Sequence, residues 1–158
     1  MARSGSRFMR LAVREARRNL KSMDGGPFGA CIVKGGRVIA VSRNTVLTGD
    51  ATCHAEINAI RIASRKMGTF DLSGCVIYST TEPCPMCFTA LHWARVGTIV
   101  YGTTIRDAQK LGFNEFAVSN ARMKTLGKSG VRLVKSRVAG ECGKLLAQWS
   151  ALPHKEVY

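Results

Sequence analysis

The sequence predicts an α/β protein in which helices cover both faces of one β-sheet. Three observations support this fold class. Strand-like and helix-like segments alternate along the chain, two strand-like runs are joined by a two-glycine turn, and 158 residues suffice for one domain with a buried core. We therefore expect a single domain over residues 1–158.

Hydrophobic periodicity and turn residues place the individual elements. Five apolar residues between Phe8 and Leu20 fall on one stripe of a helix, and Gly35-Gly36 has the composition of a two-residue hairpin turn. The expected elements, in chain order, are a helix at 6–21, strands at 28–34 and 37–42, a polar loop at 44–52, a helix at 53–67, a strand at 75–80, a helix at 85–95, a strand at 98–101, an irregular or weakly helical stretch at 103–128, a strand at 131–134 and a helix at 140–152. The helix at 53–67 is expected to pack through its isoleucines and Ala63.

Composition restricts the partners. No apolar run approaches the ~20 residues of a membrane span, so no membrane partner is expected. The net charge of +14, from 24 basic and 10 acidic residues, admits nucleic acid as a partner. The charge is scattered, however, and no aromatic residues interleave it as a base-stacking surface would need, so nucleic acid is not favoured. Without a secretory signal, the six cysteines predict a reduced, cytoplasmic protein and no disulfide framework.

Two short segments contain residues suited to metal chemistry. Cys84 and Cys87 are three residues apart, so on a helix they share one face and can bind one ion. Pro85 suits the first helical position, which places both sulfurs at the positive end of a helix dipole and favours thiolates. His54 is the natural third ligand for a borderline-soft ion such as Zn²⁺.

Three protein ligands leave the fourth tetrahedral position open, which is typical of catalytic zinc. Glu56 lies two residues beyond His54, so its side chain leaves the helix in another direction and suits proton transfer better than ligation. A closed structural site would need a fourth donor, and both His92 and His154 are poorly placed for it. A redox pair would not require the nearby histidine and glutamate.

These motifs carry a family resemblance. His54-Ala55-Glu56 and Pro83-Cys84-Pro85-Met86-Cys87 match the zinc deaminase signature, so the chain resembles the cytidine deaminase-like superfamily over nearly its whole length. The resemblance implies a three-layer α/β/α fold with a five-stranded mixed sheet. It also implies hydrolytic deamination, with His54, Cys84 and Cys87 as zinc ligands and Glu56 as the proton shuttle.

Finer features resemble the bacterial guanine deaminases of this superfamily. The resemblance rests on the segments 25–30, 50–56, 82–87, 93–95 and 112–116. It implies a homodimer that can exchange C-terminal segments, and conversion of guanine to xanthine and ammonia. The substrate-binding residues that it implies are Phe28, Asn44, Ala55, Trp93, Glu115 and Tyr158.

Glu115 has a physical reason to select guanine. Guanine presents N1–H and N2–H₂ side by side as donors, and a carboxylate can accept both hydrogen bonds. Adenine has an acceptor at N1, which cannot form a hydrogen bond with a carboxylate. Leaving such a buried polar group unpaired costs ~1–3 kcal/mol of binding free energy. Residues 127–138 match the family poorly, and guanine does not explain the basic charge. The alternatives are a guanosine or related purine deaminase, a tRNA adenosine-to-inosine deaminase, and a non-catalytic zinc-stabilised RNA-binding module.

Overall fold

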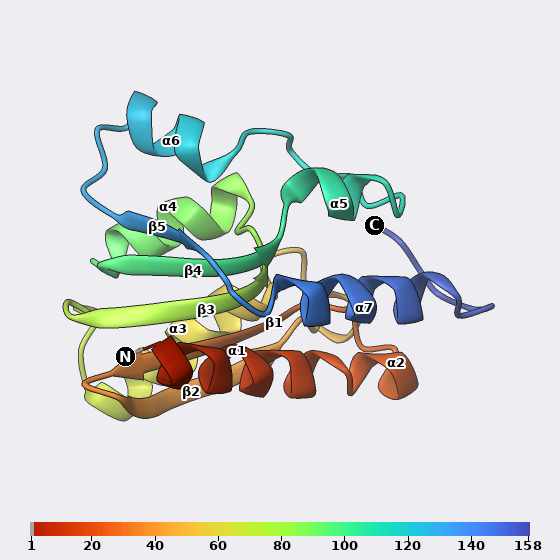
Figure 1. Cartoon of the computed structure of the whole chain (residues 1–158), viewed down its shortest axis with the longest axis horizontal. Coiled ribbons are helices and arrows are strands. Elements are labelled where there is room, and N and C mark those ends of the chain that lie inside the picture. Colours follow the sequence, from red (N-terminus) through yellow and green to blue (C-terminus); the bar gives the residue numbers. More distant parts are fainter. Residues whose placement is uncertain (1) are drawn as a thin grey trace.

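The computed structural model describes residues 2–158 and has a five-stranded sheet at its centre (Figure 1). The strand order is β2-β1-β3-β4-β5, and β1 is antiparallel to both of its neighbours. The pairs β3–β4 and β4–β5 are parallel, so the sheet is mixed, as predicted. The strands are β1 (Gly29–Lys34), β2 (Arg37–Arg43), β3 (Cys75–Thr81), β4 (Thr98–Thr103) and β5 (Arg132–Lys135).

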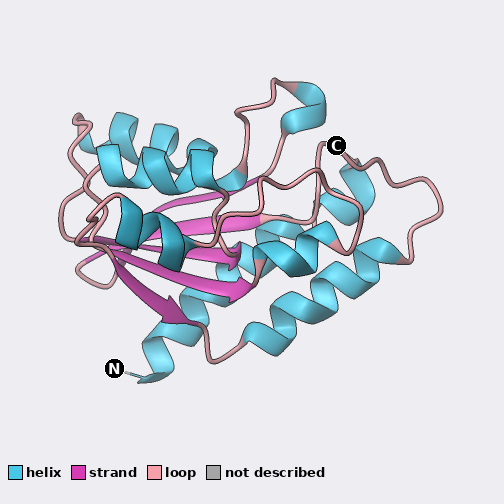
Figure 2. Ribbon diagram, turned by 90° about the horizontal axis from the view of Figure 1, so that it is seen from above, coloured by secondary structure: helices cyan, strands magenta, loops and turns pink. Residues whose placement is uncertain are grey.

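Helices cover both faces of the sheet, which confirms the predicted three layers (Figure 2). Helices α1 and α7 pack on one face, and α3 and α4 pack on the other. The helical segments are α1 (Ala2–Ala16), α2 (Asn19–Ser22), the short 3₁₀ turn η1 (Val46–Thr48), α3 (Ala55–Met67), α4 (Pro85–Trp93), α5 (Ile105–Gln109), α6 (Asn120–Leu126) and α7 (Ala139–Ser150). Within residues 2–158, no helix has the length and apolarity needed to cross a membrane.

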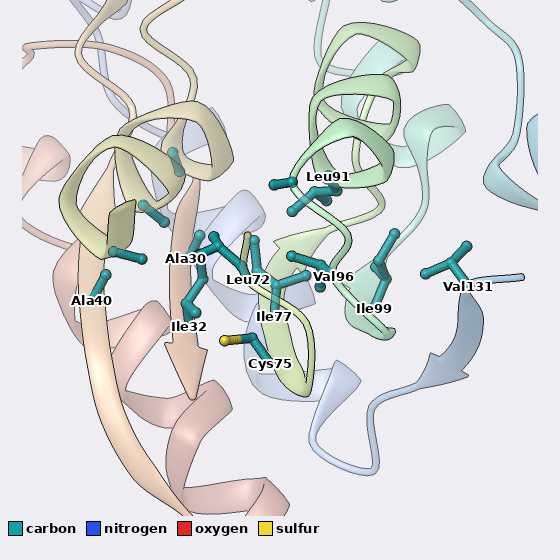
Figure 3. Packing of buried hydrophobic residues seen from close by; sticks show 14 of the residues in the cluster. Ala30, Ile32, Ala40, Leu72, Cys75, Ile77, Leu91, Val96, Ile99 and Val131 are labelled. Carbon is teal, nitrogen blue, oxygen red and sulfur yellow. The ribbon is translucent and has the colours of Figure 1, made fainter. Parts of the chain in front are cut away.

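Strand β1 joins the two halves of the core. Its side chains alternate between the faces, and both faces are buried. Ala30 and Ile32 pack with residues of α3 and α4, as Figure 3 shows for the labelled core residues. Cys31 and Val33 point to the opposite side and pack against α1 and α7.

The expected one-domain extent remains a prediction, and it begins at Met1, which lies outside the described residues.

The hairpin and the N-terminal helix show how local sequence produces these elements. Gly35 and Gly36 both have positive φ, of 55° and 76°, which a two-residue turn between twisted strands requires. The predicted helix at 6–21 is instead two helices, because α1 ends at Ala16 and α2 begins at Asn19. The buried Asn19 amide donates to the Gly26 and Asn44 carbonyls at 2.8 Å each, so this break ties the helix end to the loops at the carboxyl edge of the sheet.

One further expectation needs correction. Ile62 was predicted on the apolar side of α3 with Ile60 and Ala63, but it is 39% exposed, whereas Ile60 and Ala63 pack in the core together with Ala59. The stretch at 103–128, expected to be irregular or weakly helical, contains the short helices α5 and α6 joined by a loop. The capping box between Thr104 and Asp107 marks the start of α5.

Candidate metal centre and substrate cavity

The predicted metal ligands meet where two helices begin. His54 is the N-cap of α3 and Cys84 is the N-cap of α4, each with extended backbone. Pro85 occupies the start of α4, as predicted, and Cys87 lies in the same first turn. Both helix N-termini therefore point toward one place beside the carboxyl end of β3, and their dipoles favour negative ligands there.

The three ligand atoms have the spacing of a tetrahedral zinc site. The nitrogen and the two sulfurs all lie within 4.8 Å of one another, and His54 Nδ1 is 3.6 Å from Cys84 Sγ. An ion about 2.1 Å from nitrogen and about 2.3 Å from sulfur would separate those two atoms by about 3.6 Å. In the part of the chain that the structure describes, no other such cluster of histidine, cysteine and acidic residues is found. The donors present therefore fit zinc.

The two thiols titrate as a coupled pair. A hydrogen bond from Cys87 is the main cause that lowers the pKa of Cys84 to about 4, and His54 contributes while burial opposes the shift. Burial is the main cause that raises the pKa of Cys87. The hydrogen bond with Cys84 and the charges of Glu56 and Cys84 add to the rise. The protein alone therefore stabilises a single thiolate here. A bound cation is what would favour the second.

Glu56 lies beside these ligands but is held by the sheet. Its side chain is buried, and Ser79 Oγ lies 2.7 Å from Oε1. The other oxygen, Oε2, lies 3.5 Å from Cys87 Sγ, on the side of the three ligands. Burial raises the pKa of Glu56, while the His54 charge and the Ser79 hydrogen bond oppose this rise. A carboxyl with a raised pKa next to a metal site is suited to taking up and releasing a proton.

A cavity of about 260 Å³ opens onto this cluster. Its volume is below the usual range for drug-sized ligands, so it suits a compact ring system. It brings together four of the predicted substrate-binding residues with His54, Glu56 and Cys84. The lining residues are Phe28, Asn44, Val46, Ala51, His54, Glu56, Thr81, Glu82, Cys84, Phe113, Asn114, Glu115 and Tyr158.

Asn44 presents a defined hydrogen-bonding group to the cavity. Its Oδ1 accepts from the Val46 backbone N–H at 3.0 Å and from the Tyr158 hydroxyl at 2.7 Å. Because a backbone N–H can only donate, the atom that faces Val46 must be the amide oxygen. The Nδ2 group is left to donate, and Asn44 therefore favours a ligand that offers it an acceptor.

The C-terminal residue lies in the cavity of its own chain. The Tyr158 hydroxyl also accepts from the Gly26 backbone N–H at 3.0 Å, and the Tyr158 backbone oxygen accepts from Asn114 N–H at 2.9 Å. The Tyr158 ring packs edge-on against Phe113, and burial raises the pKa of its hydroxyl to about 12. The phenol is therefore neutral and can donate to Asn44.

Glu115 is an acidic residue of the cavity lining that lies outside the two metal-binding segments. It follows Phe113 and Asn114 in the loop after α5. Burial is the main cause that raises the pKa of Glu115 to about 7, with Cys84 adding to the rise and His54 opposing it. A cation at the ligand cluster would lower this pKa and favour the carboxylate, which accepts hydrogen bonds.

The side chains of two predicted substrate-binding residues do not line the cavity. Trp93 is 75% exposed and does not line the cavity. It is the last residue of α4, whose first turn is at the cavity, so the helix carries it roughly 12 Å away. The Ala55 side chain is buried and also does not line the cavity. What Ala55 could offer a ligand is its N–H, since the first N–H groups of a helix have no intrahelical acceptor.

Sequence reasoning missed three buried residues that support the site. Glu82 accepts from Asn120 N–H at 2.8 Å and from Ile105 N–H at 3.2 Å, so one carboxylate ties the starts of α6 and α5 to the metal-binding turn. Asn120 also donates to the Pro83 carbonyl at 2.6 Å. Ser79 contacts Glu56 as described above. An acidic residue between a buried strand and a proline was a readable signal for Glu82, whereas nothing local marks Ser79.

Comparisons with known proteins agree with this geometry. Residues 2–103 match the cytidine and deoxycytidylate deaminase zinc-binding region. The guanine deaminase of Bacillus subtilis (strain 168) is 43% identical over 109 residues, which cover 68% of this chain and 70% of that protein. The tRNA-specific adenosine deaminase of Agrobacterium fabrum is 46% identical over 96 residues. The match covers 60% of this chain and 62% of that protein, which is less than two thirds of its length.

A solved structure extends the likeness beyond the matched region. The guanine deaminase from Nitrosomonas europaea has a TM-score of 0.82 and 30% identity, covering 92% of this chain and 84% of that chain. The shared fold, the three clustered ligands and the matched zinc-binding region lead to one assignment. The chain belongs to the cytidine and deoxycytidylate deaminase zinc-binding family.

Proposed function

We propose that this protein hydrolytically deaminates a guanine-type purine, converting guanine and water to xanthine and ammonia. The observation that carries the proposal is the base-sized cavity beside the zinc ligands, with Glu115 as an acceptor and Asn44 as a donor. Guanine matches this arrangement, because its N1–H and N2–H₂ are adjacent donors and its ring also offers acceptors. The similarity to the guanine deaminase of Bacillus subtilis supports the same substrate.

The residues of the chain divide the chemistry between them. His54, Cys84 and Cys87 would hold zinc, which when bound supplies the Lewis acidity that activates water at neutral pH. Water adds at the carbon that carries the amine, and the bond from that carbon to the amine nitrogen breaks. Glu56 takes a proton from the attacking water and gives it to the departing amine.

The remaining residues orient the base and exclude water. Asn44 and Glu115 bind polar groups on the purine edge, while Phe28, Phe113 and Tyr158 supply the apolar walls. The Ala55 N–H and Trp93 remain predicted contacts. A homodimer is also proposed, and the exposed Trp93 and Met86 on α4 support it, because a second subunit would cover them.

A second candidate is deamination of adenosine in tRNA. The similarity to the Agrobacterium fabrum enzyme and the net charge of +14 favour it. Glu115 disfavours it, because a carboxylate meets the N1 acceptor of adenine without a hydrogen bond. A guanosine-type substrate would have to fit its ribose past Tyr158. A non-catalytic RNA-binding module would have no use for a buried carboxyl such as Glu56 beside the zinc ligands.

A substrate panel tests the proposal directly. The zinc-loaded protein should release ammonia from guanine faster than from adenine, cytosine, guanosine or adenosine, with xanthine as the product seen by chromatography. If another compound of this panel released ammonia and guanine released none, that compound would replace guanine as the proposed substrate.

Glu115→Gln should lower kcat/KM for guanine by ~10-fold or more while zinc content stays unchanged. The amide replaces one acceptor oxygen with a donor, which faces a donor of guanine.

In the wild type, kcat/KM should also fall as pH drops through the raised pKa of Glu115, because protonation removes the carboxylate. This pKa is about 7 before a cation lowers it, and the Gln variant should lack the step. A Gln variant with wild-type kcat/KM at every pH would remove Glu115 from substrate recognition.

Deleting residues 153–158 should raise KM for guanine and lower kcat/KM by about 10-fold, since Tyr158 closes the cavity and orients Asn44. Tyr158→Phe keeps the ring but not the hydroxyl and should fall between the deletion and the wild type. His154→Ala, an exposed change in the same segment, is the matched control and should be neutral. Unchanged kcat and KM in the deletion would exclude Tyr158 from the site.

A further inference from the structure

Ser79 connects Glu56 to the backbone of the central strand β3. Its side chain is buried, at 2% exposure, on the strand that ends at the metal-binding turn. Its Oγ lies 2.7 Å from Glu56 Oε1 and 2.6 Å from the Thr81 carbonyl oxygen. A serine hydroxyl both donates and accepts, so it can donate to an ionised carboxylate, or accept from a protonated one while it donates to Thr81. Either way it stays bonded to Glu56.

The two oxygens of Glu56 therefore have different environments. Oε1 is bonded to Ser79, and Oε2 lies 3.5 Å from Cys87 Sγ, on the side of the zinc ligands. Among the described residues, Ser79 supplies the only side-chain hydroxyl hydrogen bond to this carboxyl. Without that bond, the carboxyl would keep only its contacts with Cys87 Sγ and its own backbone N–H, and Oε1 would no longer be tied to β3. Proton transfer depends on such alignment, since small displacements of reacting groups cost large factors in rate.

We propose that Ser79 is a positioning residue for Glu56, holding Oε1 against β3 so that Oε2 faces the reacting water and amine. The inference rests on the proposed deamination but does not depend on which purine is the substrate. Ser79 does not line the substrate cavity, so its effect should appear in kcat and not in KM. It should also require a carboxylate at position 56.

Ser79→Ala should lower kcat on the order of 10-fold, the scale of one hydrogen bond to a charged group, with KM and zinc content within about 2-fold of wild type. The matched control is Ser42→Ala. The Ser42 hydroxyl is also buried and donates at 2.6 Å to the Ala55 carbonyl, at the start of the same helix, but it does not contact Glu56. We expect Ser42→Ala to lower the thermal midpoint like Ser79→Ala while it retains wild-type kcat.

A double-mutant cycle separates positioning from general support of the fold. In the Glu56→Gln background, adding Ser79→Ala should leave the residual rate within about 2-fold, because the group that Ser79 positions is gone. An equal loss of rate in both backgrounds, or a loss that follows zinc content or KM, would overturn the inference. If Ser79→Ala fails to fold, Ser79→Thr and Ser79→Val form a pair of equal size in which only threonine should preserve kcat. Equal kcat in that pair would likewise overturn it.

The measurements distinguish failure of this inference from failure of the proposed function. All variants are assayed on the amine that the wild-type enzyme hydrolyses fastest. If the wild type does not deaminate guanine, that result counts against the proposed function. The Ser79 experiment can still be done on whichever amine the wild type does hydrolyse. A wild-type kcat in Ser79→Ala, on any substrate, counts against the role of Ser79 alone.

Discussion

Glu56→Gln should retain one zinc ion per chain and a folded structure while its kcat falls about 10²-fold or more. Glutamine has nearly the shape of glutamate, so the buried position behind Cys87 and Ser79 should remain filled. It cannot accept and release a proton at neutral pH, so the amine would leave without a proton donor. Zinc measured by elemental analysis and kcat measured by ammonia release test the two halves of this prediction separately.

Two outcomes would contradict this assignment for Glu56. A zinc-free but folded Glu56→Gln protein would make Glu56 a zinc ligand. The position of Glu56, two residues beyond His54, argues against this, because its side chain leaves the helix in another direction. An unchanged kcat would remove it from proton transfer. Glu156→Gln, at an exposed position in the C-terminal segment, is a control for the change of one charge and should leave both measurements unaltered.

Cys84→Ala should lose zinc and with it essentially all turnover. With one thiolate and one imidazole left, the site keeps two of its three ligands, and metal ligands contribute steeply to affinity. The variant should also lose the thermal stabilisation that added zinc gives to wild-type protein, because a ligand that binds the folded state raises its stability. Elemental analysis and thermal unfolding with and without zinc measure these effects.

Cys53→Ala is the matched control for the loss of one thiol near the site. Cys53 precedes His54 but is not part of the ligand cluster, so its removal should leave the zinc content unchanged. Stoichiometric zinc in Cys84→Ala would show that other residues form the metal site.

Local sequence signals predicted the sheet well. The continuous apolar run of β1 and the glycine pair after it determine the hairpin, and both depend on neighbours only a few residues away. The break at Asn19 was not predictable in this way, because the Asn19 amide bonds to carbonyls at Gly26 and Asn44, which only the fold brings near. The exposure of Ile62 likewise depends on how closely α3 approaches the sheet.

The candidate site shows the same division. His54, Glu56, Cys84 and Cys87 lie in two short motifs whose spacing already indicates one metal and one proton carrier. Their juxtaposition needs only that both helices begin at the same edge of the sheet. The contacts of Ser79 and Glu82 could not be predicted from the sequence, since their partners are 23 to 38 residues away.

The resemblance to guanine deaminases predicted residues that the fold brings together at one cavity. Phe28, Asn44, Glu115 and Tyr158 all line it, and their role in substrate binding stays a prediction. The resemblance also placed Trp93 there, but α4 carries that side chain away from the cavity of its own chain, to an exposed position. A pattern of residues along a chain does not reveal which of them a helix carries out of reach.

The central claim is tested most directly by comparing guanine and tRNA as substrates at low and high salt. Guanine is neutral at pH 7, so its deamination to xanthine should proceed with kcat/KM nearly constant between 50 and 200 mM salt. Turnover of a tRNA substrate should instead decline steeply over that range, since each phosphate contact releases counterions. The account predicts xanthine formation with little dependence on salt. Conversion of adenosine to inosine in tRNA, with guanine left untouched, would contradict it.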